Sequence, residues 1–139
     1  MKNKYLIFII ILMFFLSFFL ISCKQGPYSD QESKNFISDL SNLNIKFVNK
    51  VSLANAATGA ALSSAISDMQ DIRTEVSNLE VPGEDEKLSD IKESSINGMD
   101  EVIEGFQMLQ SGEDYADVVL KMQNGISILE DVANQLMKL

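Results

Sequence analysis

The stretch Ala54-Asn55-Ala56-Ala57-Thr58-Gly59 (ANAATG, residues 54–59) decides how many helices the chain forms. Apolar residues recur at steps of three and four on both sides of it, which is the spacing of an amphipathic helix. The apolar stripe stays in phase across the stretch, so the spacing permits one long helix over residues 30–79. Asn and Gly are weak helix formers, however, and an unbroken helix of about 50 residues would extend beyond its neighbours. We expect one long, kinked helix, with two separate helices as the alternative.

The same helical spacing continues to the end of the chain, and no window shows the alternation of a β-strand. Gly98 and Gly105 interrupt this pattern at a cost of about 1 kcal/mol each relative to alanine, which indicates close contact with a neighbouring helix. The expected core residues are Phe36, Leu40, Leu43, Phe47, Val51, Ala54, Thr58, Leu62, Ala65, Met69, Ile72, Val76, Leu79, Leu88, Ile91, Ser95, Met99, Val102, Phe106, Leu109, Tyr115, Val118, Met122, Ile126, Leu129, Ala133 and Leu136.

Helix ends are marked by specific residues. Ser29 or Asp30 can cap the first helix, Pro82 ends a helix because it has no N–H to donate, and Gly112 occupies a C-cap position. Acidic residues at 84–86 and 113–114 follow these breaks, where they face the positive end of a helix dipole. The prediction is therefore an all-α, antiparallel up-and-down bundle of three to four helices over residues 30–139.

The N-terminus predicts a targeting segment. Lys2 and Lys4 precede an almost unbroken apolar run over residues 5–22, which is the pattern of a secretory signal helix. The run is also just long enough to span a bilayer as a permanent anchor. Its length alone leaves both interpretations open.

Leu20-Ile21-Ser22-Cys23 ends this run, and Cys23 is the one cysteine of the chain. The motif resembles the lipobox of bacterial lipoprotein precursors: an aliphatic residue, then a small residue directly before the acceptor cysteine. The resemblance covers residues 1–23 and implies that a diacylglycerol is attached to the Cys23 sulfur and that the signal peptide is cleaved after Ser22. Two acyl chains hold a protein firmly to a membrane, at roughly 0.8 kcal/mol per buried methylene.

The expected organisation is a signal peptide over residues 1–22, a lipidated tether over 23–29 and a helical domain over 30–139. The six residues after Cys23 reach at most about 20 Å, so we expect the domain to stay near the lipid surface. This layout, with Leu-x-Val-Pro at residues 79–82 between helices, resembles several uncharacterised small helical lipoproteins of low-GC bacteria. We expect the protein outside the cytoplasmic membrane, on its outer face or on an outer membrane if the cell has one.

One acidic helix face is the candidate site for a partner. Its residues recur at steps of three and four and centre opposite the apolar stripe, so they share the outward side of one helix. The face consists of Glu86, Asp90, Glu93, Asp100, Glu101 and Glu104. A solvated face that keeps the protein soluble and a docking face for a basic envelope protein or peptide are both consistent with the pattern.

The charges are divided unevenly along the chain. Residues 23–79 hold six acids and five bases, whereas residues 80–139 hold fourteen acids and four bases. Anionic headgroups would repel the second half, so we expect it to point away from the bilayer. Nucleic acid requires a basic surface and is not an expected ligand.

The residue types argue against catalysis and cofactors. The chain has no histidine, and its acidic turn at 80–86 lacks the spacing of a calcium loop. The lipobox resemblance implies that Cys23 carries a lipid, so it is not expected to bind a metal. We therefore expect no enzyme activity, no metal and no cofactor. A non-enzymatic binding or accessory lipoprotein is the favoured function, and a protective or structural envelope lipoprotein, such as an exclusion or immunity factor, is the alternative.

Overall fold

A computed structural model of the chain describes residues 28–139, and this part is all-helical. The predicted signal helix, the cleavage site at Ser22 and the lipid acceptor Cys23 lie outside the described residues. The described elements, in chain order, are α2 (Gln31–Ala56), α3 (Gly59–Asn78), the short 3₁₀ helix η1 (Pro82–Glu84), α4 (Glu86–Ser111) and α5 (Tyr115–Leu136).

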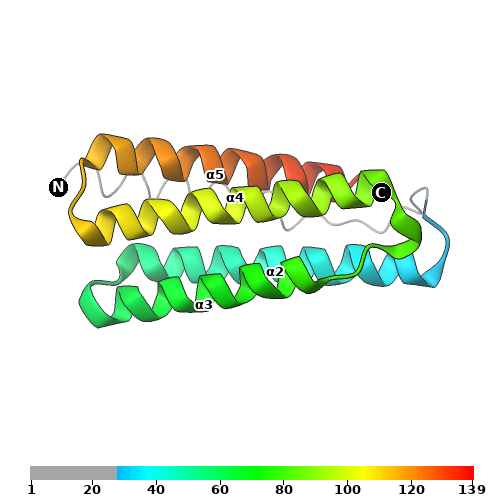
Figure 1. The fold of residues 1–139 in the computed structure, drawn as a ribbon, viewed down its shortest axis with the longest axis horizontal. Coiled ribbons are helices and arrows are strands. Elements are labelled where there is room, and N and C mark those ends of the chain that lie inside the picture. Colours follow the sequence, from blue (N-terminus) through cyan, green and yellow to red (C-terminus); the bar gives the residue numbers. More distant parts are fainter. Residues whose placement is uncertain (1–27) are drawn as a thin grey trace.

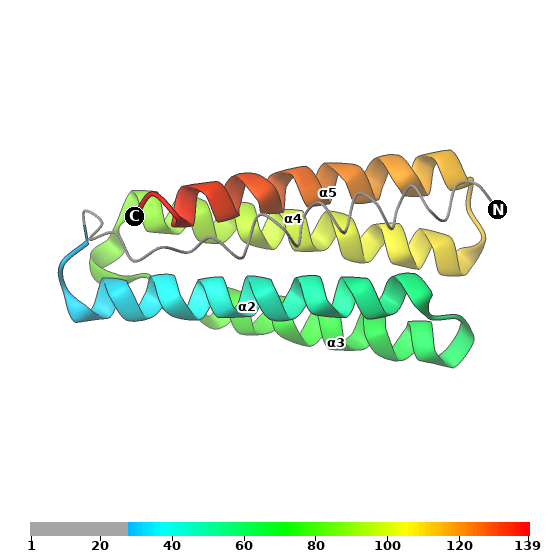
Figure 2. The same cartoon turned by 180° about the vertical axis from the view of Figure 1, so that it is seen from behind.

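The four long helices form an antiparallel bundle (Figures 1 and 2). Helices α2 and α3 make one hairpin, α4 and α5 make the other, and the two hairpins pack together chiefly through α3 and α4. The α2–α3 and α4–α5 turns lie at one end of the bundle, here called the distal end. The start of α2, η1 and the last turn of α5 lie at the other, here called the tether end (Figure 1). The predicted all-α bundle is thus confirmed for the described residues.

The expectation of one long helix across ANAATG is wrong, because the chain reverses there. Helix α2 ends at Ala56, Ala57 and Thr58 are extended, and Gly59 opens α3 with a φ of +55°. Glycine adopts this left-handed conformation without the clash of a Cβ atom. The reversal lets the apolar stripes of α2 and α3 face one common core, which a single long helix could not do.

The predicted helix ends are confirmed. The Asp30 carboxylate accepts a hydrogen bond from the Ser33 N–H at 2.8 Å, and Asp114 caps α5 by accepting from the Ala116 N–H at 2.8 Å. Gly112 ends α4 in the left-handed conformation with a φ of +80°. Each of these positions satisfies backbone groups that a helix end leaves without a partner.

The predicted core is also largely confirmed. Met69, Met99 and Met122 are buried, which agrees with a packing role rather than with a binding surface. Thr58 and Leu109 are exposed, because both lie at the distal end where their helices turn. One polar contact crosses the core: the Ser95 hydroxyl of α4 donates to the Asn44 side-chain oxygen of α2 at 2.8 Å, and Asn44 donates to the Leu40 carbonyl. Such a satisfied pair favours one register of α2 against α4.

Helices α4 and α5 approach each other through glycines. A Cβ atom on Gly125 would lie 2.7 Å from the Gly98 carbonyl oxygen and 2.7 Å from a Val102 methyl carbon. A Cβ atom on Gly98 would lie 2.8 Å from Leu129 Cγ. The two backbones are thus in direct contact, which explains the glycine at position 98. At position 105 the added Cβ would meet the Met122 side chain instead.

Gly125→Ala tests this contact. Overpacking costs about 1–3 kcal/mol, and the Gly98 carbonyl belongs to the backbone and cannot move aside alone. The variant should therefore unfold at lower urea concentration, despite a gain of about 1 kcal/mol in helix propensity. Gly105→Ala should be milder because the Met122 side chain can move, and Ser127→Ala on the exposed side of α5 is the control. Stability of Gly125→Ala equal to or above that of the wild type would contradict the contact.

Candidate functional site: the acidic face of α4

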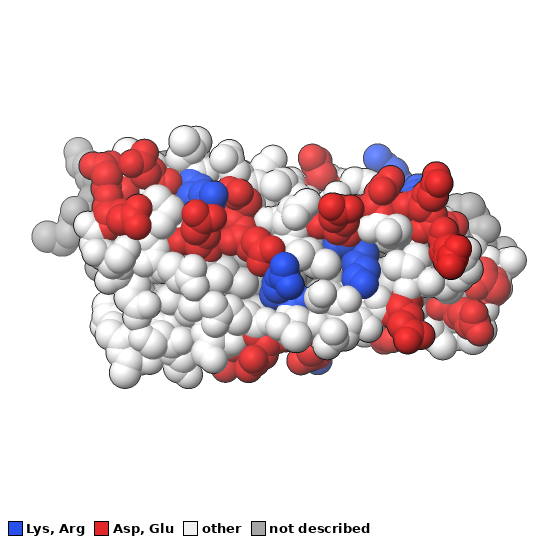
Figure 3. All heavy atoms as spheres, in the orientation of Figure 1, with Lys and Arg blue, Asp and Glu red and all other residues white. Residues whose placement is uncertain are grey.

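The acidic face lies on the outer side of α4, opposite its buried residues. Glu86, Asp90, Glu93, Asp100 and Glu104 are exposed, and Glu101 is partly buried. Figure 3 shows acidic side chains along α4 and α5, whereas the start of α3, at the lower left of that view, shows no charged residue. The six residues thus share one side of one helix, as the sequence predicts.

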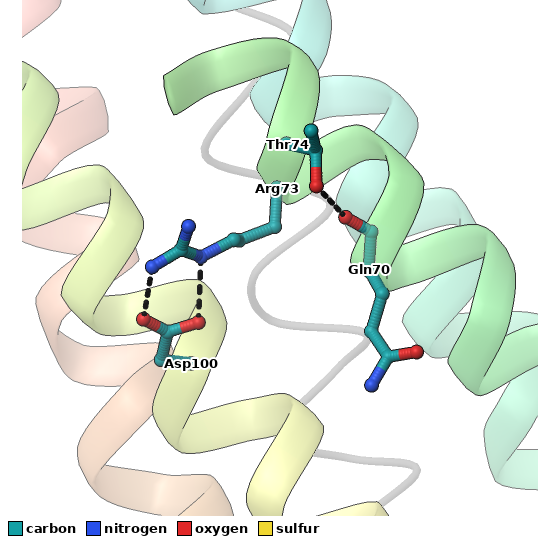
Figure 4. Close-up of polar contacts among 4 residues, drawn as sticks. All are labelled: Gln70, Arg73, Thr74 and Asp100. Carbon is teal, nitrogen blue, oxygen red and sulfur yellow. Dashed lines mark hydrogen bonds and ion pairs between the residues drawn. The ribbon is translucent and has the colours of Figure 1, made fainter. Parts of the chain in front are cut away.

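Asp100 is held by a cation from the neighbouring helix α3. The Arg73 guanidinium donates to both carboxylate oxygens of Asp100, at 2.9 Å each, and the two side chains face each other across the α3–α4 contact (Figure 4). The hydrogen bond to Asp100 raises the pKa of Arg73 further above its already high value. In the same view Thr74 donates to the Gln70 carbonyl within α3, at 2.9 Å. Asp100 therefore joins two helices rather than offering a free charge.

Glu101 and Glu104 are held from the other side by α5. The Lys121 ammonium lies 2.8 Å from a Glu104 oxygen and 3.2 Å from a Glu101 oxygen. The contact with Glu104, followed by that with Glu101, raises the pKa of Lys121. Lys121 therefore stays charged at neutral pH and offsets part of the charge of both acids.

The first two turns of α4 differ from this pattern. Within residues 28–139, Glu86, Asp90 and Glu93 form no ion pair. Glu86 and Asp90 also line an open hollow together with Val81, Glu84 and Ser89, next to η1 at the tether end. The acidic face thus has two parts: a paired half (Asp100, Glu101 and Glu104) and an unpaired half (Glu86, Asp90 and Glu93).

The carboxylates of the unpaired half can accept hydrogen bonds and ion pairs from lysine or arginine side chains. Within the described part of the chain, no cluster of acidic or other ligand residues has an arrangement that could hold a metal ion. Within residues 28–139 no helix combines the length and the apolar character needed to cross a bilayer.

Arg73 and Lys121 are absent from the sequence prediction. Each lies on a different helix from the acidic face, so their pairing depends on which helices are neighbours and not on spacing along one helix. Asp85 belongs to the acids at 84–86 that the sequence places at the start of a helix, but its contact with Tyr28 is not predicted. It caps α4 by accepting from the Leu88 N–H at 2.9 Å, and the Tyr28 hydroxyl lies 3.2 Å from both of its carboxylate oxygens.

Comparison with known proteins gives no match: no protein-family model fits the chain, and no curated protein or solved structure is significantly similar to it. The geometry of the described residues, together with the sequence, is therefore the basis for the function proposed below.

A double-mutant cycle on Arg73 and Asp100 tests the cross-link between α3 and α4. Both side chains are substantially exposed, at 35% and 49%, so the coupling energy should be modest, about 0.5–1 kcal/mol. Urea unfolding of Arg73→Ala, Asp100→Ala and the double variant gives this value. A coupling energy near zero would mean that Asp100 is as free to bind a partner as Glu86.

Proposed function

We propose that this protein is a lipoprotein anchored on the outer side of a membrane, where it acts as a non-enzymatic binding or accessory module for a basic envelope protein or peptide. The anchor part rests on Leu20-Ile21-Ser22-Cys23, a lipobox-like motif at the end of an apolar run. The binding part rests on one observation, the unpaired half of the acidic face.

Electrostatics explains why this half is the better candidate. Like charges at steps of three and four oppose a helix by about 0.2–0.5 kcal/mol per pair. In the paired half, Arg73 and Lys121 offset that repulsion. In the unpaired half no described side chain forms an ion pair with these acids. A partner that supplies lysine or arginine would therefore gain both the attraction and the relief of repulsion.

The side chains favour binding over catalysis. The chain has no histidine, and the polar pair Asn44 and Ser95 in the core is satisfied by its own hydrogen bonds. Arg73 and Lys121 join α4 to its two neighbours α3 and α5 at the surface, where both side chains are accessible to water. These features support a rigid binding surface for a partner rather than a site that activates a nucleophile or transfers a proton.

Cys23→Ser tests the anchor. The wild-type protein from its own host should have the intact mass of residues 23–139 plus a diacylglycerol and should float with membranes. The variant lacks the sulfur that carries the thioether, so it should retain residues 1–22 and carry no lipid. Ser29→Ala, in the predicted tether, should behave as wild type. A wild-type protein with a free thiol and an intact leader would refute the anchor.

A charge-neutralised variant tests the binding face. Glu86→Gln, Asp90→Asn and Glu93→Gln together should remove salt-sensitive capture of a basic partner from envelope extract, because the unpaired carboxylates are lost. A matched control, Asp39→Asn, Asp71→Asn and Glu75→Gln, removes the same charge from exposed positions on α2 and α3. Capture should persist in this control. Equal loss of capture in both variants would mean that only the net charge of the protein matters. Retained capture in the first variant would exclude the unpaired half as the binding site.

A further inference from the structure

Tyr28 joins the segment before α2 to the start of α4. Its side chain is partly buried and packs against the core, and its hydroxyl lies 3.2 Å from both carboxylate oxygens of Asp85. Burial, followed by the hydrogen bond to Asp85, raises the pKa of Tyr28, so the hydroxyl remains a donor at neutral pH. Asp85 caps α4 and is 57 positions away in the sequence. The contact therefore links two helix starts that the chain itself does not connect directly.

Each of these helix starts contains amides that depend on the capping residue. In α2 the Ser33 and Lys34 amides donate to Asp30, at 2.8 and 3.2 Å. In α4 the Leu88 and Ser89 amides donate to the capping aspartate, at 2.9 Å each. Such an amide exchanges its hydrogen with solvent when its hydrogen bond opens. The two pairs of amides therefore report separately on the opening of the two helix starts.

The connection between α3 and α4 is strained and needs contacts that hold it. Glu84 has a φ of +53°, a left-handed conformation that is unfavourable for a residue with a side chain. Such strain persists only where the surrounding structure fixes the backbone. The Lys92 ammonium donates to the Leu79 carbonyl at one end of the connection, at 2.7 Å, and Tyr28 contacts Asp85 at the other end. Loss of the Tyr28 contact should therefore favour opening of the start of α4.

We propose that Tyr28 is a strap that couples the segment before α2 to the first two turns of α4, so that the two helix starts open and close together. While the strap is closed, Asp85 is held and the turns that carry Glu86 and Asp90 stay formed. A basic partner that binds these two acids requires formed turns, and by reciprocity it favours the closed strap. This effect of a partner rests on the function proposed above, whereas the coupling between the helix starts does not.

Hydrogen exchange of single amides, measured by NMR on the full-length lipidated protein in detergent micelles, tests the strap. Tyr28→Phe keeps the ring and removes the hydroxyl. Exchange at Leu88 and Ser89 should become about two- to tenfold faster, the range that corresponds to one lost hydrogen bond. Exchange at Ser33 and Lys34 should become faster as well.

Two controls separate this effect from a general loss of stability. The Ala116 amide donates to Asp114 at the start of α5, at the distal end, and its exchange should not change in Tyr28→Phe. Tyr115→Phe, which removes a hydroxyl at the distal end, should leave the amides of both strapped helix starts unchanged. Unchanged exchange at Leu88 and Ser89 in Tyr28→Phe would overturn the strap, whatever happens at the start of α2.

A decalysine peptide at low salt, used as the basic probe, tests the coupling to the unpaired half. In the wild type it should slow exchange at the start of α4 and, through the strap, at the start of α2. In Tyr28→Phe the slowing should be confined to α4. Slowing at α4 alone in the wild type, or equal slowing at α2 in both proteins, would overturn the coupling to a partner. No slowing at either helix start in the wild type would overturn the proposed binding face and leave the strap intact.

Discussion

The contact between the backbones of Gly98 and Gly125 is the constraint on which the acidic face depends. Because the two glycines have no side chains, α4 and α5 lie close enough for Leu129 to cover Gly98. This spacing also lets Lys121 reach Glu101 and Glu104 from the neighbouring helix. A side chain at either glycine would move α4 and α5 apart. Lys121 would then lie further from Glu101 and Glu104, and the paired half would lose part of its charge neutralisation.

The two halves of the acidic face follow from this packing. Each cation partner comes from a helix that flanks α4: Arg73 from α3 and Lys121 from α5. Each ion pair is at the surface and contributes little stability alone, typically 0–1 kcal/mol. The ion pairs matter more for the distribution of charge than for stability. They neutralise one half of the acidic face, whereas Glu86, Asp90 and Glu93 have no cation partner among the described residues.

The sequence predicts those features that depend on neighbouring residues along the chain. Asp30, Gly112 and the buried methionines could be assigned because caps and apolar spacing are local signals. The reversal at residues 57–59 could not be predicted, because two antiparallel helices and one long helix give the same apolar period. The partners of Asp100 and Asp85 could not be assigned either, since they come from residues 27 and 57 positions away. Such contacts depend on which helices are neighbours in the folded bundle.

The proposed tether also restricts the proposed partner. The unpaired half occupies the first two turns of α4, within about 10 Å of the tether end at 1.5 Å per residue, and Tyr28 contacts Asp85 at the start of the same helix. Under the proposed lipid anchor on Cys23, a basic segment next to the membrane-spanning part of another protein would be held close to this half. Its high local concentration would raise the affinity without any further contact. The proposed anchor therefore favours a partner in the same membrane.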